Sequence, residues 1–167
     1  MRTPSVFNRI ALVLTLAAVA GAQGCKSAQK TPEDTAPSGD ISAIDNTMGD
    51  SDSGKAMGLE TVHFGYDTFA LDAEGKRVLA ANADILKNQS SVKIQVEGHC
   101  DQRGGIQYNI ALGEKRANAV RRYLVDLGVS KDRMTVISYG KERPIDPGTS
   151  EDAYAKNRRA NFVITSK

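Results

Sequence analysis

Residues 92–99 read Val-Lys-Ile-Gln-Val-Glu-Gly-His, so that small or apolar residues alternate with polar ones. An alternation with a period of two is typical of a strand with one buried face. A glycine-containing loop follows over 100–107. Apolar positions then recur every three to four residues over 113–127 and predict a long helix, with Gly128 placed to end it. This strand–loop–helix unit is the centre of the predicted domain.

The flanking sequence supplies the other layers of the fold. Residues 60–64 alternate as a short strand, and Asp72 is a candidate N-cap for a helix with one apolar face. Downstream, the pattern predicts a strand over 134–139, a short helix around 150–157 and a last strand over 160–165. The order strand–helix–strand–helix–strand–(helix)–strand predicts an α+β fold, a small layered sheet with helices packed on one face.

The composition excludes several classes of protein. The 167 residues carry 22 Lys and Arg against 20 Asp and Glu, which does not indicate a general nucleic-acid binder. Two cysteines are too few for a disulfide scaffold or a four-thiolate zinc site, and no cofactor motif is present. The basic pairs lack interleaved aromatic residues and are interpreted as solvated faces. These pairs are Lys115-Arg116, Arg121-Arg122 and Arg158-Arg159.

The N-terminus has the pattern of an export signal. Arg2 and Arg9 precede an apolar run over 10–20, which is shorter than the roughly 20 residues that span a bilayer. Residues 1–24 are therefore predicted to be a signal peptide. The stretch Ala22-Gln23-Gly24-Cys25 resembles a bacterial lipoprotein signal, in which the cysteine becomes the acylated first residue. The alternative is an ordinary signal peptide with an incidental Cys25.

Residues 25–58 are predicted to be a lipid-anchored flexible linker. They are rich in Ser, Asp, Gly, Ala and Thr, and their apolar residues are isolated, without helical or strand periodicity. Such a segment spans about 110 Å when fully extended. The folded domain is then expected over 59–167.

His99-Cys100-Asp101 invites comparison with a thiol enzyme. Adjacent strand residues point to opposite faces, so His99 and Cys100 are not expected to meet. His63, the other histidine, does not provide metal-ligand spacing with them. Cys100 is interpreted as a small buried residue, and neither catalysis nor a metal site is expected.

Asp101, Asn109 and Arg116 form a second candidate constellation. Asn109 and Arg116 lie about two turns apart on the predicted long helix, with Leu112 between them on the same face. Asp101 ends the preceding strand. A carboxylate and a guanidinium are therefore placed to flank a shallow cleft. The alternative is an ordinary loop aspartate with a solvated helix arginine.

Four runs of sequence carry a family resemblance. They are residues 96–104 (VEGHCDQRG), 108–117 (YNIALGEKRA), 138–144 (SYGKERP) and 155–160 (AKNRRA). Together they resemble the peptidoglycan-associated lipoproteins, the lipoprotein members of the group with OmpA C-terminal-like domains. The resemblance covers about 59–167, and it departs from the family at Cys100, where threonine is common.

The resemblance implies non-covalent binding of peptidoglycan through the diaminopimelate of its stem peptide. Asp101 is implied to take the ammonium of that side chain and Arg116 its carboxylate, because an arginine fork suits two parallel hydrogen bonds. The full set of implied peptidoglycan-binding residues is Asp101, Arg116, Asn109, Leu112, Gly65, Tyr66 and Asp67.

The resemblance also implies a place in the cell. It indicates a protein anchored in the outer membrane by the lipid on Cys25, with its domain in the periplasm. There it would tether the membrane to the wall, contact TolB and other Tol proteins, and support envelope integrity and cell division. No enzymatic activity is expected. Two alternatives are an enzyme using His99 and Cys100, and an OmpA-like protein-interaction module that does not depend on peptidoglycan.

Overall fold

The computed structural model describes residues 49–167. The predicted signal peptide, the lipidation at Cys25 and the first part of the predicted linker lie outside the described residues. None of the helices in the described part is long and apolar enough to cross a membrane.

The predicted order of strands and helices is confirmed, and with it the α+β class. The elements are β1 (Val62–His63), α1 (Ala73–Asn88), β2 (Lys93–His99), α2 (Ile106–Asp126), the 3₁₀ turn η1 (Lys131–Arg133), β3 (Met134–Gly140), α3 (Glu151–Asn157) and β4 (Arg159–Ser166). Asp72 caps α1 as expected, since its side chain accepts a hydrogen bond from the backbone N–H of Gly75 at 2.7 Å. Gly128 follows α2 with a φ of 94°, the left-handed conformation of a helix-ending glycine.

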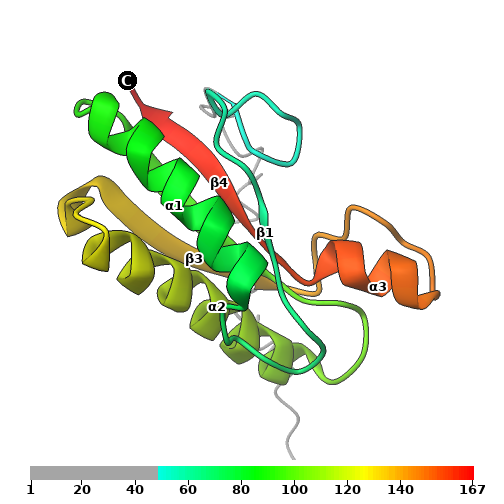
Figure 1. The fold of residues 1–167 in the computed structure, drawn as a ribbon. Coiled ribbons are helices and arrows are strands. Elements are labelled where there is room, and N and C mark those ends of the chain that lie inside the picture. The colour runs from blue at the N-terminus through cyan, green and yellow to red at the C-terminus, as the bar shows by residue number, and fades with distance from the viewer. Residues whose placement is uncertain (1–48) are drawn as a thin grey trace, which may run out of the picture. The chain divides into compact units, whose positions relative to one another are not determined.

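The four strands form one sheet in the order β1-β4-β2-β3. β2 and β3 are parallel and are joined through α2, whereas β4 runs antiparallel to both β1 and β2. Figure 1 shows α1 and α2 together on one face of the sheet, with α3 beyond the ends of the strands. The core lies between these two helices and the sheet, and includes Leu79, Val120 and Phe162, each fully buried.

The closest approach between helix and sheet is at two glycines. A Cβ at Gly98 of β2 would lie 1.9 Å from the backbone oxygen of Gly113 in α2. A Cβ at Gly113 would lie 2.3 Å from the hydroxyl oxygen of Ser138 in β3. Only glycine allows this contact. It presses the first half of α2 against the ends of β2 and β3, which is where the candidate site forms.

The folded unit extends beyond the predicted boundary at Leu59. β1 pairs with only the first residues of β4, and residues 49–51 pair with β4 further along. Ser51 N–H donates to the Phe162 carbonyl at 2.9 Å, and Ile164 N–H donates to the Gly49 carbonyl at 3.0 Å. The prediction of a linker is therefore wrong for residues 49–58. These contacts are backbone hydrogen bonds and single buried side chains, which leave no periodic pattern in the sequence.

Candidate functional site

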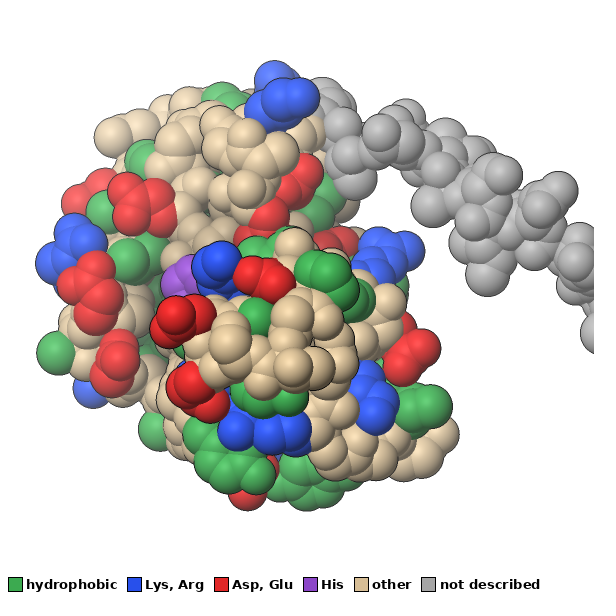
Figure 2. Space-filling model, turned by 90° about the vertical axis from the view of Figure 1, so that its right-hand side faces the viewer, with side chains coloured by type: hydrophobic (Ala, Val, Ile, Leu, Met, Phe, Trp, Pro, Cys, Tyr) green, Lys and Arg blue, Asp and Glu red, His purple; other side chains and the backbone are tan. Residues whose placement is uncertain are grey.

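A cleft of about 230 Å³ opens where the loop after β2 meets the start of α2 and the turn after β1. It is lined by Tyr66, Asp67, Cys100, Asp101, Arg103, Gly104, Tyr108, Asn109, Leu112 and Arg116. The structure thus brings together the predicted site residues on one cleft, and Gly65 adds its carbonyl as a hydrogen-bond acceptor for Arg116. Figure 2 shows the α3 end of the molecule, where acidic, basic and hydrophobic side chains are interspersed.

Arg116 is buried in the wall of the cleft, with only 1% of its surface exposed. Its guanidinium donates to three backbone carbonyls. Nε donates to Thr68 at 2.9 Å, Nη1 to His99 at 2.8 Å and Nη2 to Gly65 at 3.1 Å. A guanidinium has five N–H groups, so two remain for another partner. The prediction that the Lys115-Arg116 pair is solvated is wrong for Arg116.

Arg116 has no acidic partner among the residues that the structure describes. Among the ion pairs of residues 49–167, none includes its guanidinium. The Phe64 ring lies 5.2 Å from the guanidinium carbon. Burial lowers the pKa of Arg116, an effect that the charge of Asp101 only partly offsets. A buried cation without a counter-ion, beside an open cleft, is a site for an anion.

Asp101 is also buried, at 5% exposure, but its carboxylate is fully engaged. Oδ1 accepts hydrogen bonds from the backbone N–H and Nε of Arg103, at 3.1 and 3.2 Å. Oδ2 accepts from Arg103 Nη2 at 2.7 Å and from Arg158 Nη1 at 3.4 Å. Burial raises the pKa of Asp101, but the bonds from Arg103 outweigh it and hold the pKa below the usual 3.8. Asp101 and Arg116 thus share the cleft without contacting each other in an ion pair.

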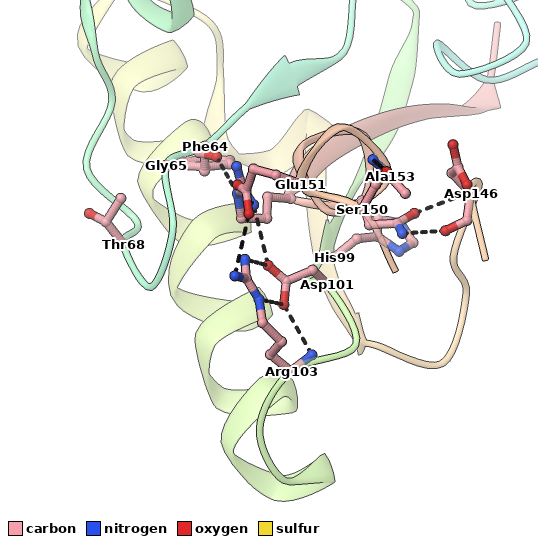
Figure 3. A network of polar contacts seen from close by, with 12 residues as sticks. Phe64, Gly65, Thr68, His99, Asp101, Arg103, Asp146, Ser150, Glu151 and Ala153 are labelled. Carbon is pink, nitrogen blue, oxygen red and sulfur yellow. Dashed lines mark hydrogen bonds and ion pairs between the residues drawn. The ribbon is translucent and has the colours of Figure 1, made fainter. Parts of the chain in front are cut away.

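Arg103 connects Asp101 to α3, as Figure 3 shows. Its guanidinium lies between the rings of Tyr66 and Tyr154, 4.2 and 4.4 Å from their centroids. Glu151 bridges the two arginines of the network. Its carboxylate lies 3.4 Å from Arg103 Nη1 and 2.8 Å from Arg158 Nη1. No part in the site was expected for Arg103, Glu151 or Tyr154.

The prediction that Arg158 and Arg159 form a solvated face is also wrong, because both residues are buried. Arg158 is 7% exposed and donates from Nε to the Phe64 carbonyl at 3.0 Å. Arg159 is 3% exposed and donates from Nε to the Asp52 carboxylate at 2.7 Å. Arg103 and Arg158 both lie inside runs that carry the family resemblance. That placement was the one feature of the sequence that could have indicated their part in the site.

Asn109 acts on the loop beside the cleft. Its side-chain amide donates to the Arg103 carbonyl at 2.8 Å and to the Gly105 carbonyl at 3.2 Å. It therefore fixes the loop that carries Arg103. Leu112, at 8% exposure, supplies apolar surface to the cleft wall.

Two exposed tyrosines form the rim. Tyr66 and Tyr108 are 63% and 55% exposed, and the Tyr108 hydroxyl donates to the Asp67 carboxylate. This hydrogen bond raises the pKa of Tyr108. Asp67 has a φ of 51°, which turns the chain back towards the cleft after β1.

His99 and Cys100 contact different elements, as the strand pattern predicts. Cys100 is 3% exposed, and its thiol donates to the Asn109 carbonyl on α2 at 3.4 Å. Burial raises the pKa of Cys100, which opposes formation of a nucleophilic thiolate. The His99 ring instead stacks on Tyr139 of β3, with centroids 5.6 Å apart, and its Nε2 lies 3.5 Å from the Glu97 carboxylate.

Comparisons with known proteins agree with this architecture. The OmpA family matches residues 63–158. A peptidoglycan-associated lipoprotein of Pseudomonas aeruginosa is 43% identical over 120 residues, covering 72% of this chain and 70% of the relative. Another, from Rhizobium meliloti, is 37% identical over 155 residues, covering 93% of this chain and 85% of the relative.

Solved structures show the same fold. The crystal structure of the peptidoglycan-associated lipoprotein from Burkholderia pseudomallei superimposes with a TM-score of 0.60 at 40% identity, covering 62% of this chain and 88% of that one. The C-terminal domain of Helicobacter pylori MotB, at 24% identity, shares the fold with a TM-score of 0.61, covering 66% of this chain and 87% of that one. The matched span and these relatives show that the chain belongs to the OmpA family, among the peptidoglycan-associated lipoproteins.

Proposed function

We propose that this chain binds peptidoglycan non-covalently, by holding the free end of a diaminopimelate side chain in the cleft of Asp101 and Arg116. The observation that carries the proposal is the buried Arg116 guanidinium, which lines the cleft and has no acidic partner among the described residues. The family supports the choice of ligand, since the relatives are named for their association with peptidoglycan.

The chemistry of the ligand fits the charges around the cleft. The free end of diaminopimelate carries an ammonium and a carboxylate on one carbon. The carboxylate takes the two remaining N–H groups of Arg116, and the ammonium takes Asp101. The pair discriminates only where water is excluded, and both residues are at least 95% buried.

The wider proposal concerns the envelope. A lipid on Cys25 holds the chain in the outer membrane, the segment that follows reaches towards the wall, and the domain binds it in the periplasm. Many anchored copies on one polymer gain from effective concentration, so weak single sites suffice. Membership of the Tol-Pal system, with contact to TolB, and support of envelope integrity and cell division are part of this proposal.

The first test uses the unaltered domain. Arg116 also holds three backbone carbonyls, so truncating it tests folding and binding together. We therefore propose co-sedimentation with purified sacculi in the presence of free meso-diaminopimelate or of cadaverine. Diaminopimelate is expected to release the protein. Cadaverine, which has the two ammonium groups but no carboxylate for Arg116, is expected not to release it.

A variant pair tests the acidic side. Asp101→Asn keeps the shape of the side chain but removes its charge, and is expected to lose most of the binding. Asp84→Asn is the control, because Asp84 forms an exposed pair with Lys87 on α1. Equal binding by both variants, or release by both ligands, contradicts the proposed site. Release of soluble wall fragments would favour an enzyme instead, and failure to bind sacculi would favour a protein-interaction module.

A further inference from the structure

The place that a ligand's ammonium needs on Asp101 is already filled. A carboxylate has about four lone-pair positions. Those of Asp101 receive three N–H groups of Arg103, one from its backbone and two from its side chain, and one from Arg158. An incoming ammonium must therefore replace one of these donors.

The side chain of Arg103 is the donor able to leave. The Arg158 side chain is 8% exposed and is held by the Phe64 carbonyl, and the Arg103 backbone N–H is fixed by its loop. The Arg103 side chain is 34% exposed. It also has other support, because the rings of Tyr66 and Tyr154 lie on it and Glu151 is 3.4 Å from Nη1. These contacts stabilise the guanidinium after it gives up Asp101.

We propose that Arg103 is a specificity-determining residue that competes, from within the chain, with the ammonium of the ligand for Asp101. The inference rests on the proposed function, since it concerns the same cleft and the same ligand. On binding, the guanidinium moves off Asp101 and stays between the two tyrosines beside Glu151, while the ammonium takes its hydrogen bonds.

The consequence concerns discrimination. With Arg103 in place, a ligand that brings only a carboxylate to Arg116 leaves no buried carboxylate unpaired, so it is penalised little for lacking an ammonium. Without Arg103, Asp101 keeps only Arg158 as a cationic partner, and the ammonium becomes worth more. Arg103 thus lowers the affinity of the cleft for the free end of diaminopimelate. It also lowers the preference of the cleft for diaminopimelate over a ligand that lacks the ammonium.

The experiment compares two ligands on the full domain. Calorimetric titration of Arg103→Gln with meso-diaminopimelate and with its N,N′-diacetyl derivative gives an affinity ratio. We expect that ratio to rise about two- to fivefold over the unaltered protein, the range for an ion pair with one partly exposed partner, through tighter binding of diaminopimelate. Arg77→Gln is the matched control. Arg77 forms an exposed pair with Glu74 on α1, away from the cleft, and its loss is expected to leave the ratio unchanged.

A second measurement needs no substitution. The Nε–H resonance of Arg103, bonded to Asp101 Oδ1, is expected to shift on addition of diaminopimelate and not on addition of the diacetyl derivative. A fall in diaminopimelate affinity in Arg103→Gln, or an unchanged ratio, overturns the inference and makes Arg103 a support for Asp101. If the inference about Arg103 is overturned in this way, the proposed function still stands as long as the unaltered protein binds diaminopimelate and Asp101→Asn does not. Absence of diaminopimelate binding by the unaltered protein overturns both.

Discussion

Arg103 and Arg116 border the same cleft with the same side chain, yet their surroundings are opposite. Arg103 lies on a loop, is one-third exposed, and is bonded to Asp101, beside Glu151 and two tyrosine rings. Arg116 lies on α2, is 1% exposed and meets three backbone carbonyls, with no acidic partner among the described residues.

The different surroundings give the two guanidinium charges different roles. The charge of Arg103 is neutralised inside the protein, so it contributes little attraction for an anion. The charge of Arg116 is solvated by carbonyl dipoles alone, and it remains available to an anion that enters the cleft. Exposure by itself gives the wrong ranking here, because the more buried arginine is the one that still needs a counter-ion.

The largest expected effect comes from lifting α2 off the sheet. Gly98→Ala places a Cβ 1.9 Å from the Gly113 backbone oxygen, which has no way to rotate aside. We expect a loss of about 3 kcal/mol in the free energy of unfolding. The same shift would expose Arg116. Urea denaturation measures the loss. Gly105→Ala, whose Cβ meets open space, is the control, and equal stability of the two variants would contradict the close approach.

The next effect compares the two arginines directly. Arg116→Met leaves three carbonyls without their donor, and is expected to cost about 2–4 kcal/mol of unfolding free energy. Arg103→Met removes a partly buried ion pair, but the Asp101 carboxylate keeps Arg158 as a partner, so the expected cost is smaller, about 1 kcal/mol. Denaturant titration of both variants tests this difference in stability. Equal shifts of the two unfolding midpoints would contradict it.

A third prediction extends the comparison to His99, a buried group on the other side of β2. Burial lowers the pKa of His99 below its usual 6.5, although Glu97 and Asp52 raise it in part. The unfolded chain therefore binds the proton first as pH falls. Stability is expected to be full above pH 6.5 and to decline below it, by at most about 1.4 kcal/mol per pH unit for one proton.

His99→Gln is expected to flatten this decline. His63→Gln, at an exposed position of β1, is expected to retain it. Thermal unfolding between pH 5 and 8 gives the slopes, and an unaltered slope in His99→Gln would show that another group is responsible.

The smallest effect is expected at the rim. The turn after β1 is held from inside by Arg116, through Gly65 and Thr68, and from outside by the Tyr108 hydroxyl on Asp67. Tyr108→Phe removes only the outer contact, which is exposed. We expect diaminopimelate affinity to fall by less than about fivefold, with unfolding unchanged. A larger fall would make the Tyr108 hydroxyl a direct ligand contact.

Much of this architecture followed from local pattern. The alternation over 92–99 and the apolar spacing over 113–127 predict β2 and α2, because periodic burial leaves a periodic sequence. The capping of α1 by Asp72 and the end of α2 at Gly128 followed from residue type. Residues 49–58 did not, since their attachment to β4 is made by backbone hydrogen bonds and by the single polar side chains of Ser51 and Asp52, which leave no periodic pattern.

The candidate site divides in the same way. Asp101 and Arg116 were identified from their places on a strand end and a helix face, helped by the resemblance. The partners of Asp101 were not. Arg158, at the end of α3, donates to Asp101 from 57 residues away along the chain, and Glu151 bridges Arg158 and Arg103. No periodicity in their local sequence marks Arg158 as buried or Glu151 as bridging.

By itself, the amino-acid sequence determined the order of elements, the family and the choice of Asp101 and Arg116 as candidate site residues, because these depend on periodicity, residue type and motif. The tertiary structure alone decided which charges are satisfied. Asp101 is bonded by Arg103 and Arg158, while Arg116 is left with carbonyl dipoles. The physical reason is that the state of a charge depends on which groups and how much water surround it in space, and distant segments supply those groups only when the chain folds.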